Sequence, residues 1–123
     1  MTSTPERRRY PRFTAKLPLR VKVVGGIVQH DPLPLVTQNL SKTGLFFPSP
    51  QRIEPGQSIE VEVTFVGAGL DGSNVSVSGT GYIVRAESSK TPGWYRLAAA
   101  FNESPSGDEL DWQNLVARFD KKS

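Results

Sequence analysis

Proline and glycine recur along this whole chain and constrain its fold more than any other feature. The sequence has 10 prolines and 11 glycines among its 123 residues. Proline fixes its own φ angle and lacks an amide donor, and glycine weakens a helix interior, so long helices have little room. The spacing instead predicts many short strands joined by turns, within a single domain.

Alternation of apolar and polar residues predicts where the strands lie. The clearest pattern covers residues 58–66, where apolar residues such as Ile59 and Val61 alternate with glutamates, so that one face is buried. Less regular patterns predict five more strands, at residues 19–24, 33–38, 45–47, 75–86 and 94–101. Two glycines inside one of them, Gly79 and Gly81, predict a bend or bulge.

The last part of the chain predicts a helix. Ser106-Gly-Asp-Glu109 has the form of a capping box, with serine as the N-cap and glutamate three residues later. Behind it, Trp112 and Val116 belong to an apolar stripe at helical spacing. We therefore expect one amphipathic helix over residues 108–119, packed across an end of the sheet.

These elements together predict an all-β domain of five or six antiparallel strands with a C-terminal α-helix. Closing so short a sheet into a β-barrel, fully or nearly, removes its exposed edge strands. The domain organisation is then a basic arm at residues 1–18, a barrel at 19–104, and the helix and tail at 105–123.

Several classes of function are disfavoured by what the sequence lacks. It has no cysteine, which excludes disulfides and thiolate metal sites, and we expect no metal. We find no signal peptide and no apolar run near the roughly 20 residues that cross a bilayer, so we expect a cytoplasmic protein away from the membrane. The one histidine, His30, lies beside Asp31 in a proline-rich turn, and no Gly-x-Ser-x-Gly nucleophile elbow is present. We expect a binding domain and not an enzyme.

Positive charge is concentrated at the N-terminus. The formal net charge is +3, yet seven of the 15 lysines and arginines fall in the first 30 positions, where Glu6 is the only acid. Such an arm attracts anions, but its charge alone is equally consistent with a basic tail that is only solvated. Within it, Arg8 and Arg12 are four positions apart in a segment that Pro11 keeps extended, and they stand roughly 13 Å apart. Guanidinium groups fork onto phosphate oxygens and onto the O6 and N7 edge of guanine.

A second polar motif, Asn39-Leu-Ser-Lys-Thr-Gly44, is predicted to form a turn. Asn39 offers an amide donor and acceptor, and Ser41 offers a hydroxyl. Gly44 has no side chain to block a base laid against its backbone. The same residue types are also ordinary turn formers, so the motif alone has two interpretations.

The two motifs in this order, on an all-β chain of this length, resemble the signature of the PilZ family. Arg-x-x-x-Arg on an N-terminal arm is followed by Asn-x-Ser-x-x-Gly with its trailing aromatics. Gly81-Tyr-Ile-Val-Arg85 and Leu97-Ala-Ala-Ala-Phe101 fall where the last two strands of that family belong. The likeness covers residues 7–119. It implies a six-stranded antiparallel β-barrel with a C-terminal helix, and a bacterial receptor for the second messenger cyclic di-GMP.

The resemblance also implies the site residues. Arg8 and Arg12 would bind guanine and phosphate groups of cyclic di-GMP. Asn39, Ser41 and Gly44 would make the remaining contacts on the guanine side. Substituting either arginine or Gly44 is expected to weaken binding and to leave the stability nearly unchanged, because these residues lie on an arm and a turn.

Arg7 places a third guanidinium beside the predicted pocket. PilZ-like domains with an arginine at this position tend to take an intercalated ligand pair, so the resemblance implies two cyclic di-GMP molecules per protomer. The extra positive charge offsets repulsion between the stacked phosphates. The chain departs from the family pattern at Asn39, where aspartate is frequent, and at Ala99 and Ala100, where glycine is common.

A domain with this site and no output of its own would signal by changing its shape or surface toward an effector protein, with no nucleic-acid partner. Two alternatives remain from the sequence. One is a PilZ-like interaction module that does not bind nucleotide. The other is a small barrel that binds single-stranded nucleic acid through the basic arm. The latter needs exposed aromatic residues, whereas Phe46 and Phe47 are predicted to lie in the core.

Overall fold

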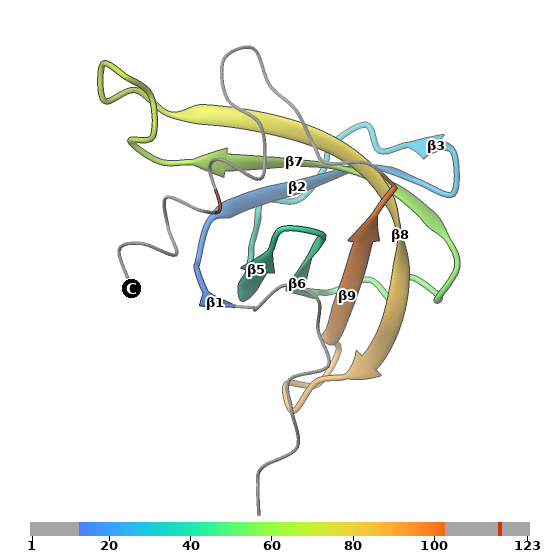
Figure 1. The fold of residues 1–123 in the computed structure, drawn as a ribbon. Helices are drawn as coiled ribbons and strands as arrows, with labels where there is room; N and C mark the ends of the chain where they lie inside the picture. Colours follow the sequence, from blue (N-terminus) through green and yellow to red (C-terminus); the bar gives the residue numbers. More distant parts are fainter. Residues whose placement is uncertain (1–12, 103–115, 117–123) are drawn as a thin grey trace, which may run out of the picture.

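The computed structural model describes residues 13–102 and Val116 of this chain. Within this part, nine strands form one sheet in which every pairing is antiparallel (Figure 1). The strands are β1 (Phe13–Thr14), β2 (Pro18–Val24), β3 (Ile27–Val28), β4 (Leu35–Val36), β5 (Asn39–Ser41), β6 (Gly44–Ser49), β7 (Ser58–Phe65), β8 (Val75–Ser88) and β9 (Tyr95–Phe101).

The sheet is curved and open, so the prediction of a closed six-stranded barrel is wrong. Its strand order is β1-β5-β6-β9-β8-β7-β2-β3, and β4 pairs with β2 outside this path. Figure 1 shows β8 arching along the side of the molecule, which curves the sheet around its core. The two terminal strands, β1 and β3, do not pair with each other.

β4 is short, and two prolines limit its beginning. A strand was predicted over residues 33–38, but only Leu35–Val36 is in a strand. Pro32 and Pro34 precede it and have no amide to donate to a ladder. Beyond β4, isolated bonds replace a ladder: the Thr37 amide donates to the Leu17 carbonyl at 2.9 Å, and the Gln38 amide to the Phe46 carbonyl at 2.7 Å.

Three strands were missed by the sequence analysis. β3 follows a tight turn in which both Gly25 and Gly26 have positive φ angles, 56° and 83°, so the glycines continue the strand as a hairpin. β5 was predicted as part of a turn, and β1 as part of the arm. The predictions at β2, β7, β8 and β9 are confirmed to within a few residues.

Glycine in β8 serves a different purpose from the predicted bulge. The irregularity in the β8–β9 pairing lies between Ile83 and Arg85, beyond both glycines. At Gly81, an added Cβ would overlap the carbonyl oxygen of Ala100 on β9. Glycine is therefore needed here because the two backbones approach closely.

The core lies on the concave side of the sheet. On β7 the predicted alternation is confirmed, since its apolar side chains are buried and its glutamates are only partly buried. The largest fully buried side chains are Phe47, Phe65, Leu19, Leu40, Ile53, Ile83, Leu97, Val61, Val63 and Val77. Burying each side chain of this size contributes about 1.5–3 kcal/mol.

The predicted helix over residues 108–119 lies outside the described residues except for Val116. Val116 itself is in a helical conformation, is 1% exposed and belongs to the core cluster. Within the part of the chain that the structure describes, no helix is long and apolar enough to span a membrane.

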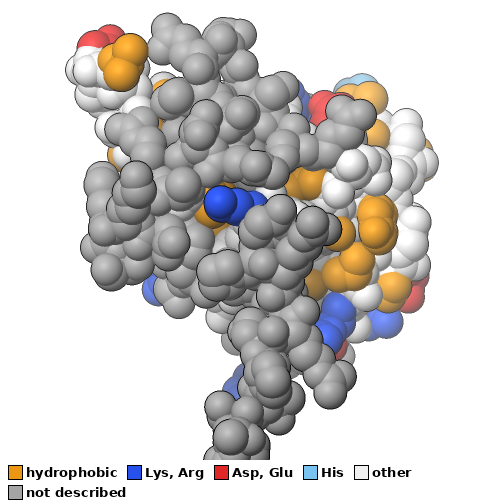
Figure 2. Space-filling view, viewed as in Figure 1, with side chains coloured by type: hydrophobic (Ala, Val, Ile, Leu, Met, Phe, Trp, Pro, Cys, Tyr) orange, Lys and Arg blue, Asp and Glu red, His pale blue; other side chains and the backbone are white. Residues whose placement is uncertain are grey.

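Figure 2 shows hydrophobic side chains on the part of the surface that lies over β8. The exposed large apolar residues of this strand are Tyr82 and Val84.

Candidate functional site

The Asn-x-Ser-x-x-Gly motif forms a tight β-hairpin made by β5 and the start of β6. Ser41 and Gly44 are register partners, so the turn contains only Lys42 and Thr43. The Thr43 amide donates to the Ser41 hydroxyl oxygen at 3.3 Å. The Thr43 carbonyl accepts from the Phe101 amide at 2.9 Å, which fixes the turn against the end of β9. The predicted six-residue turn is thus a two-residue turn between paired strands.

The three motif residues of the predicted site share one face of the sheet. Directly paired residues on antiparallel strands project to the same face, and successive residues alternate. Leu40 pairs with Leu45, which pairs with Ala99, and all three belong to the core cluster. Asn39, Ser41 and Gly44 therefore lie on the opposite face, which we call the outer face.

The start of the described chain runs beside this hairpin. β1 pairs with β5, with Phe13 opposite Leu40 and Thr14 opposite Asn39. The predicted ligand residues Arg7, Arg8 and Arg12 lie outside the described residues. Arg12 is bonded directly to Phe13, and consecutive Cα atoms are about 3.8 Å apart. The described chain therefore begins one residue after Arg12, on a strand that pairs with the motif strand β5.

Buried Thr37 connects the chain segments that follow β1 and precede β5. Its hydroxyl donates to the Ala15 carbonyl at 2.6 Å and accepts from the Leu17 amide at 2.9 Å. Thr37 is 1% exposed, so both backbone groups would otherwise be left without these bonds in the interior. This pair of bonds fixes the chain that leads out of the arm against the chain that leads into the hairpin.

Asn39 carries a buried polar atom without a bonding partner. Its Oδ1 atom is inaccessible to solvent and accepts no hydrogen bond in the described structure. An unpaired buried acceptor costs about 1–3 kcal/mol, and native proteins keep few of them. Asn39 Oδ1 is therefore an unsatisfied acceptor within the motif hairpin.

Ser41 and Gly44 have structural tasks in the hairpin. Ser41 is buried, and its hydroxyl accepts the turn bond from Thr43. A Cβ on Gly44 would overlap the carbonyl oxygen of Ala99 on β9. The absence of a side chain at Gly44 therefore lets β6 and β9 approach closely. The expectation that a Gly44 substitution leaves the stability unchanged is wrong for this reason.

The structure adds a basic and aromatic pair that the sequence analysis missed. Phe46 is buried as predicted, at 7% exposed, but it pairs with Asn39 and Ala98 on the outer face and lies outside the main core cluster. The guanidinium of Arg96 lies over the Phe46 ring, 5.2 Å from its centroid. The sequence could have predicted this orientation, because successive side chains of a strand point to opposite faces, so Phe46 faces away from Leu45 and Phe47.

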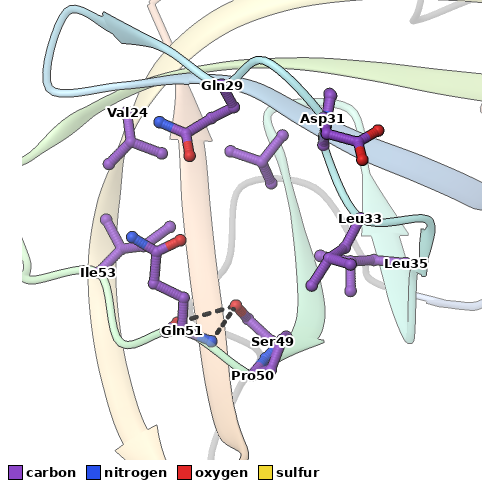
Figure 3. A pocket seen from close by; sticks show the side chains of 11 residues that line it. Val24, Gln29, Asp31, Leu33, Leu35, Ser49, Pro50, Gln51 and Ile53 are labelled. Carbon is purple, nitrogen blue, oxygen red and sulfur yellow. Dashed lines mark hydrogen bonds between the residues drawn. The ribbon is translucent and has the colours of Figure 1, made fainter.

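The cavities that described residues line lie away from the hairpin of Asn39, Ser41 and Gly44. One of about 160 Å³ has an apolar floor that includes Val24 and Ile53, and Gln29 and Gln51 beside it (Figure 3). Ser49 in its wall is satisfied by two hydrogen bonds with the Gln51 backbone. A second cavity of about 350 Å³ lies beside β2 and β7. Neither contains a predicted site residue, and no group of three metal-ligating side chains occurs among the described residues.

Comparisons with known proteins agree with this architecture. No curated protein matches the chain. Among solved structures it is similar to the Bacillus subtilis inhibitor of motility, MotI/DgrA, with a TM-score of 0.72 and 13% sequence identity. That match covers 95% of this chain but 51% of MotI/DgrA, so the chain spans about half the length of that protein and shares its fold. In a scan against protein families, the PilZ domain matches residues 6–118. With nearly the whole chain matched, the protein belongs to the PilZ domain family.

Proposed function

We propose that this chain is a receptor domain for cyclic di-GMP in the bacterial cytoplasm. PilZ domains are generally receptor domains for this ligand, and they act by binding and not by catalysis. The observation that carries the proposal is the β1–β5 pairing. Thr14, two residues after Arg12 in the sequence, pairs with Asn39, and this supports a site to which both the arm and the hairpin contribute.

The described half of the site supplies the contact for guanine. Asn39 Oδ1 is a buried acceptor that lacks a partner, and guanine presents N–H donors on its Watson–Crick edge. An asparagine has one such oxygen, so it accepts fewer of these bonds than an aspartate would. Ser41 and Gly44 shape the same face of the hairpin, where the ligand would lie.

The arm supplies the charge in this proposal. Arg8 and Arg12 fork onto phosphate oxygens or onto the guanine O6 and N7 edge. Arg7 provides a further guanidinium, and with it the domain takes two cyclic di-GMP molecules per protomer. Binding then changes the surface that the domain offers to an effector protein.

Calorimetric titration with cyclic di-GMP tests the proposal. We expect the wild type to bind, and the Arg8→Ala/Arg12→Ala double variant to bind at least about tenfold more weakly, since a charge-assisted hydrogen bond contributes about 1.5–3 kcal/mol. Arg20→Ala is the matched control, because it removes an exposed arginine on β2.

Asn39→Ala tests the described half of the site separately. It should weaken binding, and it should not lower the stability of the free protein through a lost hydrogen bond, since Asn39 Oδ1 makes none. Wild-type affinity in both the double arginine variant and Asn39→Ala would contradict the proposed site. A wild type that takes no cyclic di-GMP would favour an interaction module, and competition by an oligonucleotide would favour a nucleic-acid platform.

A further inference from the structure

An arginine far from both sequence motifs reaches the outer face beside Asn39. Asn39 on β5 pairs with Phe46 on β6, and Phe46 pairs with Ala98 on β9. Arg96 lies two residues before Ala98, and therefore on the same face. Its guanidinium extends over the Phe46 ring, at 5.2 Å from the centroid. The charge thus lies over the side chain next to Asn39.

The Arg96 side chain is exposed and its donors are available. Its register partner on β8 is Glu87, yet the two form no ion pair in the described structure. Arg52 differs, because its Nε donates to Glu54 Oε2 at 2.5 Å. A guanidinium carries five N–H donors in its plane and no acceptor, so it suits phosphate and carbonyl acceptors.

The strand order places Asn39 on β5, between β1 and the strand β9 that carries Arg96. The order in this part of the sheet is β1-β5-β6-β9. Neighbouring strands are about 4.8 Å apart, so β1 and β9 are separated by roughly 14 Å. A ligand seated on Asn39 is therefore within reach of the positive charge of Arg96 on the β9 side.

We infer that Arg96 is a further ligand-binding residue for cyclic di-GMP, and that Phe46 is a positioning residue that holds its guanidinium beside Asn39. This inference rests on the proposed function. Arg96 donates to acceptor groups of the ligand, either a phosphate or the guanine O6 and N7 edge, from the β9 side of the hairpin. The sheet itself then supplies a cation to the site, in addition to those of Arg7, Arg8 and Arg12.

Calorimetric titration of the full chain with cyclic di-GMP tests this inference. Arg96→Ala should weaken binding at least about tenfold, as expected for the loss of a charge-assisted hydrogen bond. Arg96→Lys should lie between this variant and the wild type, because lysine keeps the charge and loses the fork. Phe46→Leu should weaken binding about two- to fivefold through loss of the ring contact that positions Arg96.

The controls separate binding from folding. Arg20→Ala removes the same charge from β2, which β8 and β7 separate from β9 in the strand order. This variant should bind within about twofold of the wild type. Thermal melting checks each variant, above all Phe46→Leu, because Phe46 is largely buried. Arg96 is exposed, so Arg96→Ala should melt as the wild type does.

Two outcomes overturn the inference, and they have different consequences for the proposed function. If the wild type binds and Arg96→Ala binds equally well, Arg96 is not in the site, and the proposed receptor function stands. If the wild type does not bind cyclic di-GMP, the proposed function and this inference both fail.

Discussion

Replacing Gly44 with alanine should destabilise the whole domain, although the sequence alone predicts that Gly44 lies in a surface turn. The new Cβ would overlap the Ala99 carbonyl oxygen and would lie 3.3 Å from the Ala99 carbonyl carbon. These atoms are backbone in a paired strand, so no flexible side chain can move aside. Strands β6 and β9 must separate near the Gly44–Ala100 pair to admit the methyl group.

The magnitude follows from three contributions. Forcing an extra methyl group into packed structure costs about 1–3 kcal/mol. Loss of the adjacent bond from the Phe101 amide to the Thr43 carbonyl costs about 1 kcal/mol more. Reduced freedom of the unfolded chain returns about 0.4–1 kcal/mol. The net loss is about 1–3.6 kcal/mol, which corresponds to a fall in Tm of roughly 4–14 °C for a domain of this size.

Thermal melting and urea denaturation of the free protein measure this effect. Ser78→Ala on β8 is the control, because its side chain is exposed and its change in stability should stay within about 0.5 kcal/mol. The urea midpoint should fall while the m-value stays constant. A fall in Tm of less than about 2 °C in Gly44→Ala would refute the argument from close strand approach.

Three other predictions follow from single residues. Thr37→Val should lower the free energy of unfolding by about 2–4 kcal/mol, since it leaves the Leu17 amide and the Ala15 carbonyl without their buried partner; urea denaturation checks this, with Thr37→Ser as the milder control. Hydrogen bonds from the Ser73 side chain and backbone lower the pKa of Asp71, so Ser73→Ala should raise it toward the ordinary value in an NMR titration. Because the folded pKa is the lower one, the contribution of Asp71 to stability is present above the unfolded pKa and is lost as pH falls through the folded value, and it is small because Asp71 is exposed. Arg7→Leu should reduce the calorimetric stoichiometry from two cyclic di-GMP molecules to one, and an unchanged stoichiometry would show that Arg7 does not set the number.

Local patterns predicted the strands well where each strand is long and has one buried face. The alternation at residues 58–65 depends only on neighbouring residues, and β7 follows it. The prediction was poorest where tertiary pairing decides the conformation. Asn39 and Ser41 are turn formers by residue type, yet they lie in a strand because β1 and β6 offer hydrogen bonds on both sides. Whether the sheet closes likewise depends on pairing between distant strands, which no single segment encodes.

The sequence by itself determined the chemistry of the candidate site: guanidinium groups on an arm, an amide and hydroxyl in a short motif, and a glycine at its end. It also determined the family, because the order of these motifs is local information. Only the tertiary structure decided which face Asn39, Ser41 and Gly44 share and what else lies there. Sheet pairing joins residues that are distant along the chain, so it placed Arg96 over Phe46 and next to Asn39. It also showed that Gly44 is needed by β9, because a contact between two backbones cannot be seen in either segment alone.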